Sequence, residues 1–138
     1  MKWSIGAARL ASEEGRLQAW IEEYLKVPEW ANPGLLRRVR KFSVEWPAPE
    51  LVVLDRFDLI AGPGPDFRFP KDSAVWECEV AAIVARGISV ESLPPLIGWV
   101  KEDGRLNLAD GNHRVAAALR VGIKELWTLV HPVPLSEN

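Results

Sequence analysis

The chain has 138 residues, of which 48% are hydrophobic and 26% charged, and its formal net charge is −2. A chain of this length forms one domain by default, and its single cysteine, Cys78, excludes an internal disulfide and a cysteine-based metal cluster. The near-neutral charge excludes a general attraction to nucleic acid, and no apolar run suits a membrane span or a signal peptide, so we expect a cytoplasmic protein without membrane contact.

The first third of the chain is predicted to be helical. Ser12 and the acidic residues after it form a helix start, and apolar residues at helical spacing predict a helix over 12–26 that ends before Pro28. Asn32 followed by a proline predicts a second helix start. The apolar side of this second helix comprises Leu35, Leu36, Val39 and Phe42. Two prolines near residue 48 then divide an N-terminal helical extension (1–47) from the main unit (48–138).

Four basic residues gather on the second predicted helix, namely Arg37, Arg38, Arg40 and Lys41. Such a cluster either contacts phosphates or forms a solvated face, and the second reading is the commoner. The seven tryptophans are many for this length and suggest large anchors, some of them for a protein partner.

The main unit is predicted to alternate strands and helices. Aliphatic and capping patterns predict a buried strand at 51–54, a helical turn at 55–60, a loop at 61–70, and a helix from Asp72 or Ser73 to Gly87. They then predict a hairpin with strands at 96–100 and 105–108, a helix that ends at Gly122, and a last strand at 126–130. This order predicts a small α+β, or mixed α/β, unit. The Gly- and Pro-rich loop 61–70 either closes over a ligand or is a rigid crossover.

Several side chains of the last two predicted helices are expected to have structural rather than chemical roles. Cys78 is expected to be a small packed residue, because no activating neighbour is visible. Glu77 and Glu79 fall on other faces than the apolar stripe, so we expect both to be solvated. The helix that ends at Gly122 is expected to pack through Val115, Ala116 and Leu119.

The segment Asp110-Gly111-Asn112-His113-Arg114 is where the sequence indicates chemistry. A strand that turns at Asp-Gly and continues as a helix leaves free backbone N–H groups at the helix start, where the dipole favours an anion. His113 and Arg114 lie in the first turn, and arginine presents donors suited to phosphate. Alternatively, Asp110 or Asn112 is an ordinary N-cap and the two basic residues are merely solvated.

This segment and its flanks resemble the ParB/sulfiredoxin-like fold family, whose members show a D-G-x-H-R box between a strand and a helix. The resemblance covers about residues 51–131 and leaves out the N-terminal helices. It implies a nucleotide site in which Gly111 gives close backbone approach, His113 and Arg114 bind phosphate, and Asp110 orients the loop or holds a metal or hydroxyl substrate. It also implies ATP, ADP or CTP with Mg²⁺ as the ligand.

The chain departs from each branch of that family at identifiable positions. Sulfiredoxins have a cysteine where Asn112 stands, so sulfinic-acid reduction is not expected. ParB proteins have G-E-R-R from the position of Gly111 and a DNA-binding domain downstream, and CTP hydrolysis needs the missing glutamate. The free-serine kinases of this fold share D-G-x-H-R but use a glutamate base, for which Asp66 would stand in here.

Three functions follow from these patterns. The first is nucleotide binding through Gly111, Asn112, His113 and Arg114, with phosphotransfer to a small hydroxyl substrate catalysed by Asp110 or Asp66. The second is a non-catalytic module that binds a protein partner, or a second copy of itself, through the N-terminal helices. The third is a DNA-associated or nuclease-like protein, which only the basic cluster at 37–41 supports. No set of metal ligands is predicted.

Overall fold

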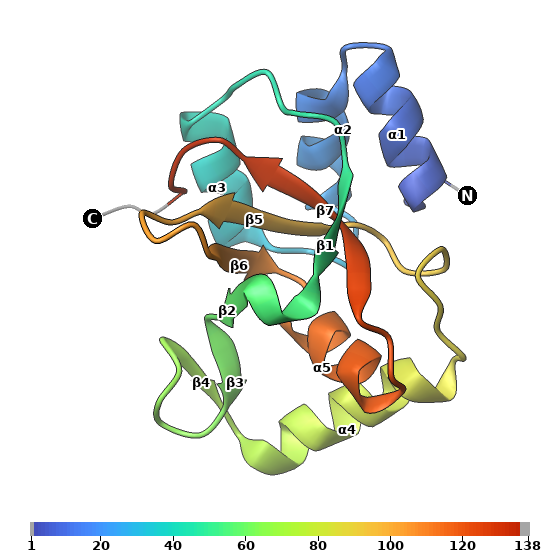
Figure 1. Cartoon of the computed structure of the whole chain (residues 1–138), viewed down its shortest axis with the longest axis vertical. Coiled ribbons are helices and arrows are strands. Elements are labelled where there is room, and N and C mark those ends of the chain that lie inside the picture. Colours follow the sequence, from blue (N-terminus) through green and yellow to red (C-terminus); the bar gives the residue numbers. More distant parts are fainter. Residues whose placement is uncertain (1, 136–138) are drawn as a thin grey trace.

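The computed structural model describes residues 2–135 and shows an α+β architecture (Figure 1). The helices are α1 (Ile5–Glu13), α2 (Leu17–Tyr24), α3 (Pro33–Lys41), α4 (Ser73–Ala85) and α5 (Asn112–Arg120), with a 3₁₀ turn at Leu54–Arg56. The strands are β1 (Glu50–Val53), β2 (Phe57–Leu59), β3 (Ala61–Pro63), β4 (Phe69–Lys71), β5 (Leu96–Val100), β6 (Leu106–Asp110) and β7 (Glu125–His131). Five strands form a mixed sheet in the order β1-β7-β5-β6-β2, and β3 pairs with β4.

Helices cover both faces of the five-stranded sheet (Figure 1), with α1–α3 on one side and α4 and α5 on the other. The pleat of β5 explains how the sheet serves two cores, because successive side chains point to opposite faces. Ile97 and Trp99 pack with the N-terminal helices, whereas Leu96 packs with Val115 of α5. The N-terminal extension therefore shares a core with the main unit, and the boundary at residues 47–48 stays a prediction.

The first predicted helix is wrong in its bounds. The chain forms two helices, α1 and α2, which are separated at Gly15 (φ +72°). A left-handed residue ends a helix, and glycine adopts that conformation without strain. Ser4 is the N-cap of α1, and its hydroxyl accepts a hydrogen bond from the Ala7 N–H (3.1 Å). Helix α3 begins as predicted, since the Asn32 side chain accepts a hydrogen bond from the Leu35 N–H.

The segment between the two predicted helices of the main unit holds more strand than expected. Strand β1 lies at the edge of the sheet with Leu51 and Val53 exposed, so it is not the buried strand that the aliphatic run predicts. The predicted turn at 55–60 ends in strand β2, which pairs with β6. The predicted loop 61–70 contains β3 and β4, each of which includes a proline, as edge strands tolerate.

The elements that carry the 110–114 segment are close to those predicted. Strand β5 has the predicted bounds, the turn at Gly104 returns the chain into β6, and Asp72 caps α4 by accepting a hydrogen bond from the Val75 N–H. Two side-chain assignments are corrected. Leu119 is 56% exposed, since α5 packs through Val115, Ala117 and Ala118, and Cys78 is exposed as well.

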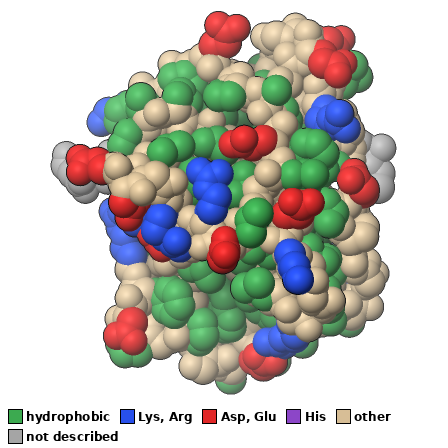
Figure 2. Space-filling model, viewed as in Figure 1, with side chains coloured by type: hydrophobic (Ala, Val, Ile, Leu, Met, Phe, Trp, Pro, Cys, Tyr) green, Lys and Arg blue, Asp and Glu red, His purple; other side chains and the backbone are tan. Residues whose placement is uncertain are grey.

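The surface is mixed in charge. Figure 2 shows acidic and basic side chains interspersed among apolar ones on the face it presents, without an extended patch of one sign. On α3, Arg40 forms an ion pair with Glu22 (3.0 Å) and Lys41 lies over the ring of Phe42, so part of the predicted basic cluster is engaged within the chain. No helix within residues 2–135 combines the length and apolar character needed to cross a bilayer.

Candidate anion-binding site

The site lies where β6 ends and α5 begins. The N-cap of α5 is Gly111, with φ at +105°, and no side chain caps the helix. Neither predicted cap, Asp110 or Asn112, has that role. The first backbone N–H groups of a helix have no acceptor within it, so those of residues 112–114 face outward at the positive end of the helix dipole. Such a helix start favours an anion.

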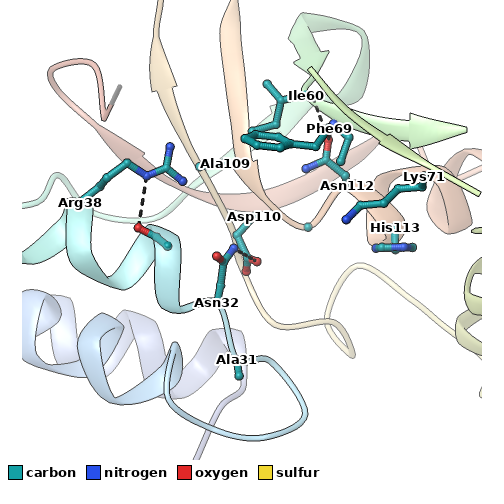
Figure 3. Close-up of a pocket in the computed structure, with 13 residues that line it drawn as sticks. Ala31, Asn32, Arg38, Ile60, Phe69, Lys71, Ala109, Asp110, Asn112 and His113 are labelled. Atoms are coloured by element: carbon teal, nitrogen blue, oxygen red, sulfur yellow. Dashed lines mark hydrogen bonds between the residues drawn. The ribbon is translucent and has the colours of Figure 1, made fainter. Parts of the chain in front are cut away.

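A cleft of about 440 Å³ opens in front of this helix start (Figure 3). Segments far apart in the sequence form its walls, namely the start of α3, strands β3 and β4, and the turn from β6 into α5. Figure 3 shows Lys71 near His113 at one end of the cleft and Arg38 at the other, with Asn32 and Asp110 pointing toward one another between them. Lys71 is exposed and forms no ion pair within residues 2–135. The cleft thus offers cationic groups beside an uncapped helix.

Asn112 holds this arrangement together. Its side chain is buried, and its Oδ1 accepts hydrogen bonds from the backbone N–H groups of Ile60 (3.0 Å) and Ala61 (3.2 Å). Its Nδ2 donates to the Leu108 carbonyl at 3.4 Å. These bonds tie the start of β3 to the start of α5, so the Asn112 side chain positions the cleft wall, and its backbone N–H remains at the helix start.

Arg114 is turned into the protein, away from the position expected of a phosphate ligand. Its side chain is 4% exposed, and Nη1 donates to the carbonyls of Pro94 (2.8 Å) and Pro95 (3.1 Å). Its Nη2 donates to Oδ2 of Asp110 at 2.7 Å. The predicted direct contact between Arg114 and a phosphate is therefore revised to a positioning role, because its guanidinium already binds protein acceptors.

Two aromatic residues of the N-terminal extension complete the surroundings of this guanidinium. It lies over the ring of Trp30, 5.2 Å from the centroid, and the Tyr24 hydroxyl faces it. Although burial opposes the charged form, Tyr24 and Asp110 raise the pKa of Arg114. Burial also raises the pKa of the Tyr24 hydroxyl well above its usual value. The extension is thus packed directly against the box residue.

Neither predicted catalytic acid is arranged as a free base. Both Asp110 oxygens accept hydrogen bonds, Oδ2 from Arg114 and Oδ1 from Nδ2 of Asn32 (3.3 Å). Asp66 lies in the turn between β3 and β4 and is not among the residues that line the cleft. Within residues 2–135, no three His, Cys, Asp or Glu side chains gather as a metal site.

His113 lines the cleft and stacks on a neighbouring ring. Its imidazole lies 4.2 Å from the Trp76 ring centroid at an interplanar angle of 30°, and Nε2 lies against a carboxylate oxygen of Glu79. Glu79 is exposed, as predicted, and it also contacts α5, which helical spacing alone could not show. Burial lowers the pKa of His113 below its usual value despite the opposing influence of Glu79.

We expect His113 to be neutral at pH 7. A proton NMR titration is expected to show its imidazole titrating below pH 6.5, and Glu79→Gln is expected to lower that pKa further because it removes the carboxylate that favours the charged form. Because folding lowers this pKa, His113 favours the folded state above pH 6.5, and this contribution is lost as the pH falls through the folded-state pKa. The sequence has two histidines, so His113→Gln identifies the resonance. Titration above 6.5 would contradict this balance.

The sequence reasoning missed several residues of this site. No local pattern marks Lys71. Arg38 was noted in the basic cluster and Asn32 as a helix start, but neither was placed with the 110–114 segment, because their position depends on the packing of α3 beside α5. Trp30 and Tyr24 were not predicted as site residues either, although the many tryptophans indicated large aromatic anchors. Their place around Arg114 depends on contacts between residues more than 80 positions apart in the sequence.

Comparisons with known proteins found similarity among solved structures. No protein-family model matches the sequence, and the search of curated proteins found no match. Among solved structures, the chain is similar to the C-terminally truncated chromosome-partitioning protein ParB from Caulobacter crescentus, complexed with CTP-γ-S. The TM-score is 0.43 and the sequence identity 19%, over 64% of this chain and 46% of that one. The chain therefore spans less than half the length of that ParB structure.

Proposed function

We propose that this protein binds a nucleotide through its phosphate groups at the start of α5. One observation carries the proposal, namely that the uncapped helix start at Gly111 opens into a cleft of about 440 Å³ with Lys71 beside it. The backbone N–H groups of Asn112 and His113 would donate to phosphate oxygens, and Lys71 would balance their charge. Arg38, at the other end of the cleft, would meet a further phosphate group.

The residues of the 110–114 segment have different roles in this site. Gly111 lets the backbone approach the phosphate, and Asn112 fixes β3 against the helix start. Arg114 holds Asp110 and the turn after β6 in place, while His113 lines the cleft. The ligands to test are ATP, ADP and CTP, with Mg²⁺ carried by the phosphate oxygens, as this cation usually is.

The arrangement of the acids in this site favours binding over phosphotransfer. Phosphotransfer to a hydroxyl group needs a residue that accepts its proton or orients it. Both oxygens of Asp110 are engaged by Arg114 and Asn32, and Asp66 lies off the cleft. Neither predicted acid is therefore placed to accept that proton.

Isothermal titration calorimetry tests the proposal. Inorganic tripolyphosphate, ATP, ADP and CTP, each with Mg²⁺, are expected to bind, and the dissociation constants are expected to rise with ionic strength because salt screens the attraction. An absence of heat with all four ligands at millimolar concentration would refute phosphate binding. DNA mobility shifts at two salt concentrations would then examine the nuclease-like alternative.

Lys71→Met is expected to weaken tripolyphosphate binding by about ten-fold, because it removes one charge-assisted contact while keeping the aliphatic stem. The matched control is Lys124→Met, which changes the net charge equally at an exposed position outside the cleft. Calorimetry on both variants separates a local contact from an effect of overall charge. Equal losses in the two variants would remove Lys71 from the site.

A further inference from the structure

A second cavity, of about 480 Å³, lies between the N-terminal end of the chain and the C-terminal end of α4. Figure 1 shows these two segments on the same side of the molecule, with the loop between α4 and β5 beside them. The apolar part of its wall comprises Trp3, Trp30, Ile83, Ile88, Leu93 and Pro94. Its volume falls in the range of small-molecule sites, and such sites are mostly apolar with a few polar groups.

A third hollow, of about 320 Å³, lies between this cavity and the anion cleft. It shares Gly111 and His113 with the anion cleft, and Trp30 and Arg86 with the aromatic cavity. The three hollows therefore adjoin one another past the start of α5, and we refer to them together as the groove. A ligand with its phosphates at Gly111 would extend along the groove toward Trp30.

The chemistry changes along the groove in a definite order. Lys71 stands at the anion end, the Glu79 carboxylate lines the middle, and the rings of Trp3 and Trp30 line the far end. Cations suit phosphate, a carboxylate accepts hydrogen bonds from sugar hydroxyls, and indole faces suit a flat ring. This order matches the phosphate, sugar and base of a nucleotide.

At the aromatic end of the groove, the side chains of Trp3 and Trp30 are held in place by neighbouring residues. Trp30 stacks on Tyr24, with centroids 6.3 Å apart and planes 26° apart, and the buried Arg114 lies over it. The ring centroids of Trp3 and Trp20 lie 5.6 Å apart. Because neighbours hold these indoles in place, a ligand ring would find its walls formed before it binds.

We infer that the Trp3–Trp30 cavity receives the nucleobase of the bound nucleotide, and that the N-terminal extension thereby supplies its base-binding site. The inference rests on the proposed phosphate site at Gly111 and adds the part of the ligand that this site leaves undefined. An ion pair between Arg86 and Glu29 (3.3 Å) at the rim places polar groups where the edge of a base would meet them.

Calorimetry with tripolyphosphate, ATP and CTP distinguishes this inference from the proposed function. At least one nucleotide is expected to bind the wild-type protein about ten-fold more tightly than tripolyphosphate, because stacking on aromatic side chains stabilises a bound base. In Trp3→Leu this advantage is expected to fall to about three-fold or less, while tripolyphosphate binding stays unchanged. Trp127→Leu, a tryptophan outside the groove, is the matched control and is expected to keep the full advantage.

A second variant guards against a folding defect in Trp3→Leu. Ser92→Phe fills the cavity from its exposed rim and is expected to remove the nucleotide advantage in the same way. Circular dichroism melts establish that each variant is folded. Equal affinities for nucleotides and tripolyphosphate in the wild type, or an advantage that survives both variants, would overturn the inference and leave the phosphate site standing. Absence of tripolyphosphate binding would overturn both.

Discussion

Replacing Arg114 by methionine is expected to lower the free energy of unfolding by about 3–5 kcal/mol, which is the cost of breaking a buried ion pair. The guanidinium is almost fully buried, and its loss leaves the Asp110 carboxylate without its main partner. The carbonyls of Pro94 and Pro95 lose a charged donor as well. Urea denaturation followed by tryptophan fluorescence measures the change.

Two further variants define the origin of that loss. Asp110→Asn combined with Arg114→Met is expected to recover part of the lost stability, since no buried charge is then left unpaired. Arg120→Met breaks an exposed ion pair with Glu77 and is expected to change the unfolding free energy little. A loss in Arg114→Met as small as that in Arg120→Met would show that the buried pair does not stabilise the fold.

Gly111→Ala is expected to be the most damaging small substitution in the site, with a loss of about 3 kcal/mol or more. The φ of +105° strains any residue with a Cβ atom, and a Cβ at this position would overlap Cδ2 of Leu96 in the core. Relief would require the turn to move, which would displace the N–H groups of Asn112 and His113. Folded Gly111→Ala protein is therefore expected to lose tripolyphosphate binding.

Gly122→Ala is the matched control for this substitution. Gly122 also has positive φ (+84°), but a Cβ there would meet no atom within 4 Å. We expect it to cost only the backbone strain, about 1–2 kcal/mol, and to leave tripolyphosphate binding intact. Thermal melts and calorimetry on the pair separate strain from overlap. Similar stability losses in the two variants would mean that Leu96 yields to the added methyl group.

The parts of the fold that the sequence predicts are those set by local signals. Asn32 and Asp72 cap their helices as expected, and the hairpin turns at Gly104. The break at Gly15 was missed because the apolar spacing continues through it into α2. Strand β1 was taken as buried because an aliphatic run does not reveal that its strand lies at a sheet edge, where Leu51 remains exposed.

The candidate site was predictable only in part for a related physical reason. A strand, a glycine and a helix predict an anion-binding backbone, and the structure has that geometry at Gly111. The direction of a side chain depends on what packs around it, and sequence spacing could not show that Trp30 and Asp110 hold Arg114 inward. Lys71 escaped notice because its place in the cleft follows from the pairing of β3 with β4.

The face of the sheet that carries Ile97, Trp99 and Leu129 has a bearing on how this chain can be shortened. Helices α1–α3 cover those side chains, so a fragment that starts at residue 48 would present them to water. The same cut would remove Asn32 from Asp110 and Trp30 from Arg114. Removal of the first 47 residues would therefore make an aggregation-prone polypeptide with half a binding groove.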